Sequence, residues 1–145
     1  MKVKDIMTPD SGCCTPDSTA RNVARLMIEC DCGEIPMLED RQSRKLAGVV
    51  TDRDMVCRLI ATGIDPSTAT ARDCMSTIVA SAKPDTDIDE CCRLMEQYRV
   101  RRLPVVDGDG ACCGIVSQAD IVRGMPRAAA AEVVRAVAAA RHPAA

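Results

Sequence analysis

Two stretches of the sequence repeat one pattern: Gly48-Val49-Val50-Thr51-Asp52-Arg53-Asp54 and Gly114-Ile115-Val116-Ser117-Gln118-Ala119-Asp120. In each, a glycine opens a short apolar run that ends at a hydroxyl residue, and an aspartate follows three residues later. A β-branched run that ends at Thr or Ser is typical of a buried strand leading into the N-cap of a helix. The hydroxyl and the carboxylate resemble a capping box, with Asp where Glu or Gln is usual. We look for function at this turn, because a helix N-terminus offers N–H groups to an anion.

The rest of the chain repeats as well. Pro16-Asp17 returns 68 positions later as Pro84-Asp85, whereas the glycine phrase returns after 66 positions. The first copy therefore carries two extra residues, which we place in the polar loop Asp40–Lys45. We expect copy one to span residues 1–66, copy two residues 67–126, and an Ala-rich tail residues 127–145.

Each copy is predicted to contain a strand, a helix, two further strands and a closing helix. The elements expected in copy one are a strand at 11–15, a helix from 18 or 19 to 30, strands at 35–38 and 46–50, and a helix at 52–62 that ends at Gly63. Those in copy two include strands at 103–106 and 112–116, with Gly124 and Pro126 ending the last helix in the same way. Apolar residues at helical spacing are interpreted as core: Val23, Leu26, Met27 and Cys30, then Cys91, Leu94, Met95 and Tyr98.

The tail, 127–141, is predicted to form an extra helix. It is expected either to pack on the two copies or to serve self-association, and a frayed terminus is the alternative.

Composition excludes several classes of function. Of the 145 residues, 47% are hydrophobic and 28% charged, as in ordinary globular proteins, and the net charge of −2 provides no basic surface for nucleic acid or anionic membrane. No apolar run approaches a membrane span, and Met1–Asp5 lacks the apolar stretch of a signal peptide. We expect a cytoplasmic protein without nucleic-acid or membrane partners. No nucleophile has an evident histidine base, so catalysis is not expected.

Ten cysteines are many for such a chain, but their spacing is a weak signal for metal. No pair has the two-residue gap of structural zinc sites, and the only histidine is His142. Several cysteines align with small apolar residues of the other copy, as buried cysteines do: Cys32 with Val100, Cys91 with Val23, Cys92 with Ala24, and Cys113 with Ala47. Cys13-Cys14 and Cys112-Cys113 remain candidates for a thiol switch or a soft-metal site. No metal site is predicted.

The two copies resemble a pair of CBS domains, also called a Bateman module, of the stand-alone bacterial type found among small stress- or hypoxia-response proteins. The resemblance rests on Asp5-Ile6-Met7-Thr8-Pro9, on Val100–Val106, and on Thr51-Asp52-Arg53-Asp54 and its counterpart, and it covers about residues 1–125. It implies a mixed α/β (α+β) fold in which two β-α-β-β-α units are related by a pseudo-two-fold axis and pack through their sheets. Such modules often bind adenine nucleotides in the two clefts between units, and they commonly form homodimers.

The resemblance also implies roles for individual residues. Asp54 and Asp120 would hold ribose hydroxyls, and Thr51 and Ser117 would reach the phosphate. Basic residues before the Leu-Pro strand often contact phosphate. The residues there are Arg101 and Arg102 in copy two and Gly33 and Glu34 in copy one. We therefore favour the cleft of Asp120. The remaining candidates are the apolar Ile115 and Val49, the segment Ser11, Gly12 and Cys13 as the opposite wall of the Asp120 cleft, and Arg53 as a basic group for the other cleft.

The predicted function is a non-catalytic sensor that binds an AMP- or ATP-like ligand, needs no cofactor, and signals through a homodimer to an unknown effector protein. Three alternatives stay open. In the first, the hydroxyl–carboxylate pairs cap helices and bind nothing, and Arg101 and Arg102 are solvated surface charges or form salt bridges at a dimer interface. The cysteines make the protein redox- or metal-responsive. The chain is a ligand-free scaffold for protein contacts.

Overall fold

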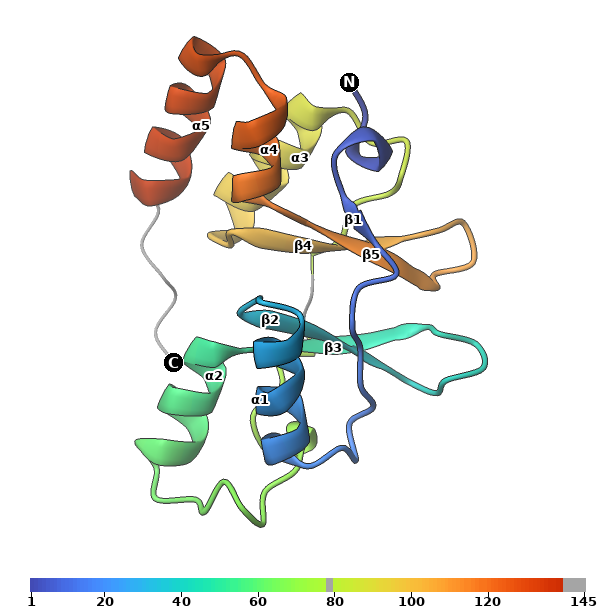
Figure 1. Cartoon of the computed structure of the whole chain (residues 1–145), viewed down its shortest axis with the longest axis vertical. Helices are drawn as coiled ribbons and strands as arrows, with labels where there is room; N and C mark the ends of the chain where they lie inside the picture. The colour runs from blue at the N-terminus through green and yellow to red at the C-terminus, as the bar shows by residue number, and fades with distance from the viewer. Residues whose placement is uncertain (78–79, 140–145) are drawn as a thin grey trace. The chain divides into compact units, whose positions relative to one another are not determined.

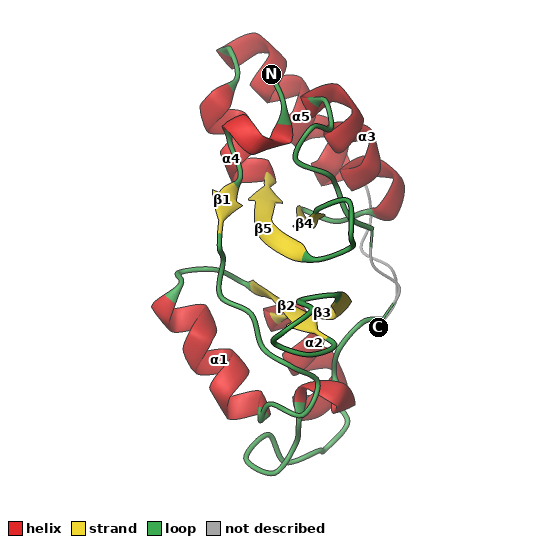
Figure 2. Ribbon diagram, turned by 90° about the vertical axis from the view of Figure 1, so that its right-hand side faces the viewer, coloured by secondary structure: helices red, strands yellow, loops and turns green. Residues whose placement is uncertain are grey.

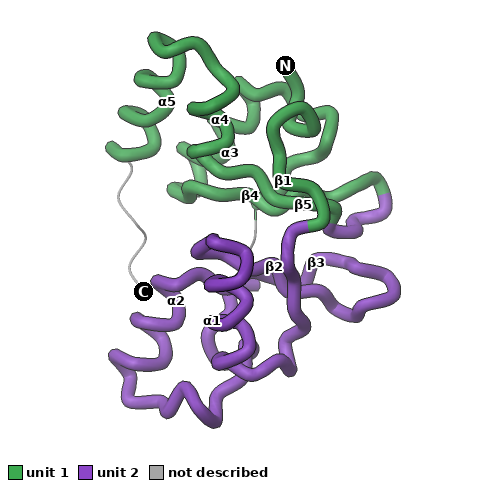
Figure 3. Tube along the Cα trace, in the orientation of Figure 1, with its two compact units in different colours: residues 1–10, 80–108, 113–144 green, residues 11–79, 109–112, 145 purple. Residues whose placement is uncertain are grey.

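The structure, a computed structural model, describes residues 1–77 and 80–139. The chain divides into two compact units that do not follow chain order (Figure 3). Among the described residues, unit 1 contains 1–10, 80–108 and 113–139, and unit 2 contains 11–77 and 109–112. Each unit therefore combines the body of one copy with a short segment that precedes the body of the other. The repeat boundaries at 66 and 126 remain a prediction.

Unit 2 is built on the antiparallel hairpin of β2 (Glu34–Leu38) and β3 (Leu46–Thr51), in which Ile35 pairs with Val50. Both of these side chains are fully buried. Helices α1 (Ala20–Glu29) and α2 (Asp52–Met55) lie on one face of the hairpin (Figure 1). A π-helical turn, Val56–Ile60, continues α2, and a 3₁₀ turn, Ala71–Asp73, follows later. The core of this unit contains Cys14, Ala20, Val23, Ile35, Met37, Val50, Leu59, Ala69, Ala71 and Cys74.

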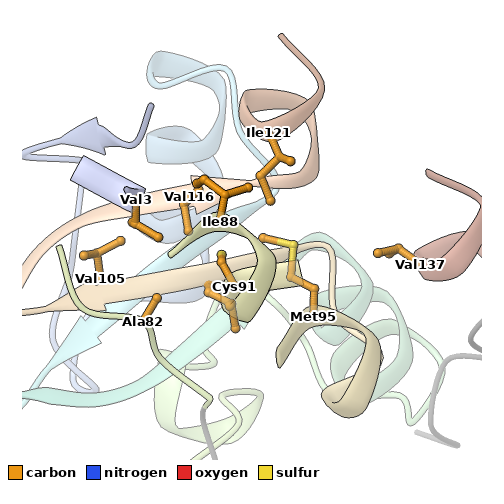
Figure 4. Close-up of a cluster of buried hydrophobic side chains, with 10 residues drawn as sticks. Val3, Ala82, Ile88, Cys91, Met95, Val105, Val116, Ile121 and Val137 are labelled. Carbon is orange, nitrogen blue, oxygen red and sulfur yellow. The ribbon is translucent and has the colours of Figure 1, made fainter. Parts of the chain in front are cut away.

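Unit 1 is built on a sheet in the order β1-β5-β4, formed by Thr8–Pro9, Cys112–Ser117 and Arg102–Val106 (Figures 1 and 2). Its helices are α3 (Ile88–Tyr98), α4 (Gln118–Gly124) and α5 (Arg127–Ala139), and a 3₁₀ turn spans Val3–Asp5. Figure 4 shows how apolar side chains from the sheet, from α3 and from α4 meet in the core. The buried set is Val3, Ala82, Ile88, Cys91, Met95, Leu103, Val105, Val116, Ile121 and Val137.

A glycine in each phrase lets a second backbone approach the strand. Val49 on β3 exchanges two backbone hydrogen bonds with Ser76, at 3.0 and 2.9 Å, and Ile115 on β5 is likewise paired with Thr8. A Cβ atom on Gly48 would collide with the carbonyl oxygen of Ser76. On Gly114 it would lie 2.5 Å from the carbonyl oxygen of Thr8. Both glycines are needed for this close approach.

The first predicted strand is wrong. Residues 11–15 form no strand, and only Cys14 makes a parallel bridge to Met37. The amide of Cys14 donates to Pro36 and its carbonyl accepts from Leu38, but the next amide, that of Thr15, donates to Ser18 Oγ. This local bond and Pro16 end the pairing after one residue. A short strand lies instead at Thr8–Pro9.

Two details of the predicted helices also differ. The closing helix of copy one is not a continuous α-helix, because the π-helical turn begins at Val56. The last residues of the two apolar stripes, Cys30 and Tyr98, are exposed, because α1 ends at Glu29 and α3 ends at Tyr98 itself. The earlier stripe residues Val23, Cys91 and Met95 are fully buried, as predicted.

The closing helices of the two copies are terminated by different residues. Gly63 has φ of +79°, the left-handed conformation expected of a glycine after a helix. Gly124 is the last residue of α4, but the residue after it, Met125, is extended. Pro126 accounts for this, since the ring of a proline disfavours the helical region for the residue before it. Copy two therefore ends its helix through proline rather than through a left-handed glycine.

The tail forms α5, as predicted, and α5 packs on α3 and α4 of unit 1. Ala130 and Val137 are buried in that contact, whereas Val134 is 41% exposed. Residues 140–141 of the predicted helix lie outside the described residues, as does His142. Among the helices described, none is long and apolar enough to cross a membrane.

Candidate functional site

The turn after β5 holds Asp120 in a closed pair with Ser117. Asp120 Oδ2 accepts hydrogen bonds from the Ser117 amide at 2.8 Å and from its hydroxyl at 2.7 Å, and Ser117 Oγ lies 3.1 Å from the Asp120 amide. The other carboxylate oxygen, Oδ1, accepts a bond from Arg123 Nη2. Asp120 is 8% exposed, whereas the side chain of Arg123 is 72% exposed. One oxygen is thus committed to the helix cap, and the other is held by a solvent-exposed guanidinium.

The turn after β3 repeats the arrangement in unit 2. Asp54 Oδ2 accepts a hydrogen bond from the Thr51 amide at 2.9 Å, and Thr51 Oγ1 accepts one from the Asp54 amide at 3.0 Å. Asp54 Oδ1 faces Arg58, with Nε at 4.0 Å. The sequence therefore predicted both caps correctly, and capping is one role of both pairs.

The residues predicted to contact phosphate lie next to the turn in both copies. In unit 1 the carbonyl of Arg101 accepts a hydrogen bond from the amide of Gln118, at 2.8 Å. In unit 2 the carbonyl of Gly33 accepts the matching bond from Asp52, at 3.0 Å. The position after Gly33 is Glu34, which is only 5% exposed. Copy two therefore has a guanidinium where copy one has none, and copy one has a buried carboxylate nearby.

The apolar candidates are buried on their strands. Val49 and Ile115 are 7% and 8% exposed. Arg53 is exposed on the first turn of α2. The predicted opposite wall of the Asp120 cleft, Ser11 to Cys13, belongs to unit 2, whereas Asp120 belongs to unit 1. A cleft that joins these residues remains a prediction.

The same segment is closely packed within unit 2. Ser11 Oγ is buried and has no hydrogen-bond partner among the described residues. A Cβ on Gly12 would come within 2.7 Å of the sulfur of Cys30. A larger residue at position 12 would therefore displace that thiol.

The cysteines are all thiols in the structure, and four of them are buried: Cys14, Cys74, Cys91 and Cys112. Burial raises the pKa of Cys91 to about 12. Burial and the nearby carboxylates of Asp54 and Asp73 raise the pKa of Cys74 to about 11. These thiols are poor nucleophiles and poor metal ligands at neutral pH, because both roles need the thiolate.

The donors of a metal site are not gathered in the parts of the chain that the structure describes. Within them, no three His, Cys, Asp or Glu side chains are grouped so as to hold a metal ion. The sole histidine, His142, lies outside these parts. The described residues therefore do not fit a metal.

Sequence reasoning missed the two arginines that face the aspartates. Arg123 is three residues after Asp120, and Arg58 is four residues after Asp54. These spacings place opposite charges on one helix face, so they were a usable signal. Because the spacing from aspartate to arginine is four residues in copy one and three in copy two, an alignment of the copies does not pair Arg58 with Arg123.

Comparison with known proteins identifies the fold. Residues 3–61 and 71–127 each match the CBS domain. The chain belongs to the CBS domain family. It contains two CBS domains, and the predicted resemblance is thereby confirmed.

Relatives of this CBS pair extend over most of its length. Hypoxic response protein 1 of Mycobacterium tuberculosis is 35% identical over 134 residues, which are 92% of this chain and 92% of that protein. A crystal structure of Hypoxic Response Protein I with two coordinated zinc ions is 36% identical and superposes with a TM-score of 0.78, covering 87% of this chain and 100% of that one. The mixed helix-and-sheet fold class is confirmed by this match.

Two further solved structures contain adenosine compounds. CBSX2 of Arabidopsis thaliana, in complex with AMP, is 27% identical with a TM-score of 0.72 and covers 85% of this chain and 94% of that one. The CBS domain pair of protein MJ0100, in complex with 5′-methylthioadenosine and S-adenosyl-L-methionine, is 25% identical with a TM-score of 0.75 and the same coverage.

Proposed function

We propose that this CBS pair is a non-catalytic regulatory module that binds an adenine nucleotide, AMP- or ATP-like, chiefly through Asp120 and Ser117. The proposal rests on one observation: the two carboxylate oxygens of Asp120 have different hydrogen-bond partners. Ser117 fixes Oδ2, so the carboxylate is already oriented. Oδ1 is bonded to Arg123, whose own side chain is largely exposed and is therefore free to turn into solvent. A ribose hydroxyl can then donate to Oδ1 in place of Arg123, so the carboxylate keeps a hydrogen-bond donor.

The Asp120 site is the stronger of the two because of the charges beside each turn. Arg101 adjoins the first residue of α4, where a guanidinium can bind phosphate with two parallel hydrogen bonds, and Arg102 follows it on β4. Glu34 occupies the position of Arg102 in copy one and opposes a phosphate. We expect one nucleotide to bind tightly and a second to bind weakly at Asp54 and Thr51, where Arg53 supplies some positive charge.

The ligand is expected to act by favouring one arrangement of a homodimer, which an effector protein in the cytoplasm reads. Any such signal requires that the ligand bind one arrangement more tightly than the other. Adenosine compounds in two solved relatives support the ligand class. The name of the mycobacterial relative supports a role in a stress response such as hypoxia. No cofactor is required.

Thermal unfolding with AMP, ATP, NAD and S-adenosylmethionine tests the proposal. A ligand that binds only the folded state raises the melting temperature in a saturable manner, by an amount that grows with its concentration over Kd. We expect this with at least one of the four ligands, and we expect Asp120→Ala to abolish most of it. If none of the four stabilises the protein, the proposal is wrong.

A matched control separates binding from capping. Asp5 accepts a hydrogen bond from the Lys2 amide at 2.8 Å, the same local bond that Asp120 makes with Ser117, at a turn with no predicted ligand role. Asp5→Ala should weaken the fold as a lost cap does, yet leave the ligand-induced rise unchanged. If both variants lose that rise, it reports stability rather than binding.

A second candidate function is a redox- or metal-responsive stress protein. The zinc ions in Hypoxic Response Protein I favour it, whereas the scattered donors and raised thiol pKa values in this chain oppose it. Thiol titration with and without reductant, together with metal analysis of the purified protein, distinguishes it from nucleotide sensing. If no ligand stabilises the protein and neither thiol titration nor metal analysis gives a positive result, a scaffold that acts only through protein contacts is favoured.

A further inference from the structure

Arg58 connects the Asp54 site to a segment outside it. The side chain leaves the π-helical turn Val56–Ile60 and is 39% exposed. Its Nη1 donates hydrogen bonds to the carbonyl oxygens of Cys74 and Met75, at 3.2 and 3.0 Å. Its Nε lies 4.0 Å from Asp54 Oδ1, too far for a hydrogen bond but close enough for electrostatic attraction. One guanidinium therefore faces both the candidate ribose-binding carboxylate and two backbone carbonyls.

Those carbonyls belong to the two residues that follow the 3₁₀ turn Ala71–Asp73, and Cys74 is the C-cap of that turn. Carbonyls at the end of a helix lack partners within it. The next residue, Ser76, exchanges two hydrogen bonds with Val49 on β3. The segment 71–76 is thus held at one point by the strand and at another by Arg58. In the sequence this segment leads from the body of copy one into copy two.

Among the residues that the structure describes, copy two shows no counterpart of this contact. The position of Arg58 in the repeat is occupied by Gly124, which has no side chain. Ile6, at the position of Cys74, fills the space instead: its Cγ2 lies 2.8 Å from where a Cβ of Gly124 would be. Asp120 is paired with Arg123 instead. Among the described residues, Arg123 donates no hydrogen bond to the backbone carbonyls of residues 6–7. Within the described parts of the chain, the connection is therefore found in copy one.

The closing helices differ at the same place. Copy one changes from α to π geometry at Val56, and Arg58 lies within the π-helical turn, whereas α4 remains α-helical to Gly124. Single π turns inside helices occur frequently at functional sites. The change of helix geometry in copy one therefore includes Arg58 and lies beyond the cap formed by Thr51 and Asp54.

We propose that Arg58 is a positioning residue that couples occupancy of the Asp54 site to the segment 71–76. The coupling rests on the proposed function, because it needs a nucleotide whose ribose hydroxyl donates to Asp54 Oδ1. That bond weakens the attraction of the carboxylate for Arg58, so the guanidinium stays with the carbonyls of Cys74 and Met75 and holds the segment more tightly. By reciprocity, loosening the segment weakens nucleotide binding at this site.

Amide hydrogen exchange of a peptide that covers residues 70–77, measured with and without saturating AMP, tests the coupling. In the wild-type protein we expect AMP to slow exchange there about fivefold or more, the lower end of typical coupling between sites. Arg58→Met keeps the apolar stem of the side chain and removes the guanidinium, so the slowing should disappear. Arg72→Met is the matched control: Arg72 lies in the segment 71–76 itself, and among the described residues its side chain pairs only with the exposed Asp17, at 3.0 Å. It should behave as wild type.

Calorimetry with AMP separates the outcomes. Asp54→Ala identifies the binding event that belongs to the Asp54 site. If AMP fills that site without slowing exchange in the wild type, or if Arg58→Met retains the slowing, the coupling is wrong and the proposed function stands. If AMP does not bind but ATP, NAD or S-adenosylmethionine does, exchange is measured with that ligand; if none of the four binds, both the coupling and the proposed function are wrong. Exchange without ligand then still measures the hold of Arg58 on the segment, because Arg58→Met should raise it and Arg72→Met should not.

Discussion

The carboxylate of Asp120 accepts hydrogen bonds from both the amide and the hydroxyl of Ser117, at 2.8 and 2.7 Å. This closed pair joins the end of β5 to the start of α4. It stabilises the turn whether or not a ligand is present. Substitutions at the pair and around it can separate its contribution to the fold from its contribution to binding.

Removing the hydroxyl of Ser117 should weaken the fold. Ser117→Ala takes away the acceptor for the Asp120 amide and one donor to its carboxylate, so we expect a loss of about 1 kcal/mol in the free energy of unfolding. Urea denaturation measures it. Ser117→Thr keeps the hydroxyl that Thr51 uses at the matching position and should lose much less. An equal loss of unfolding free energy in both variants would show that the hydroxyl does not account for the stabilisation.

The glycines that open the two phrases should not tolerate a methyl group. Gly48→Ala and Gly114→Ala force the Ser76 and Thr8 carbonyls away from the strands, and overpacking of this kind costs about 2 kcal/mol. Gly108→Ala is the control, since no atom lies within 4 Å of its added methyl group and its φ is not positive. It should change the unfolding free energy by less than about 0.5 kcal/mol. Equal effects at all three glycines would contradict the close-approach argument.

Arg101 and Arg102 should matter for ligands that carry phosphate. Replacing both with Gln is expected to weaken AMP binding about tenfold or more, since a hydrogen bond to a charged group contributes about 1.5–3 kcal/mol. Binding of 5′-methylthioadenosine, which has no phosphate, should change little. Calorimetry with both ligands checks this. Equal losses for the two ligands would indicate that the arginines act on the fold or on the nucleoside instead.

Cys91 should make the protein sensitive to alkali. Its pKa is raised by burial from 9.0 to about 12, so the thiol ionises far more readily in the unfolded chain. Its contribution to stability is complete below about pH 9 and is lost as the pH rises toward the folded-state value. Cys91→Val, which introduces the residue found at the matching position Val23, should flatten the fall in unfolding free energy between about pH 9 and 11. The same slope in both proteins would refute this assignment.

Local signals were enough to predict much of the candidate site. Thr51 with Asp54 and Ser117 with Asp120 are three residues apart, and such a pair closes whenever a helix starts between its members. The buried stripes of α1 and α3 follow from helical spacing in the same way. The exposed Cys30 and Tyr98 were missed because spacing does not show where the helix ends relative to its neighbours.

By itself, the sequence determined the repeat, the order of the main elements and the two capping pairs, because these depend on bonds and faces within a few residues. The tertiary structure alone decided that residues 1–10 join the unit of copy two and residues 71–77 that of copy one. That exchange depends on close backbone approach at Gly48 and Gly114, between residues far apart in the chain. Tertiary packing likewise placed α5 against α3 and α4 and brought Arg58 to the carbonyls of Cys74 and Met75. No local pattern encodes a contact whose partner lies 16 residues away.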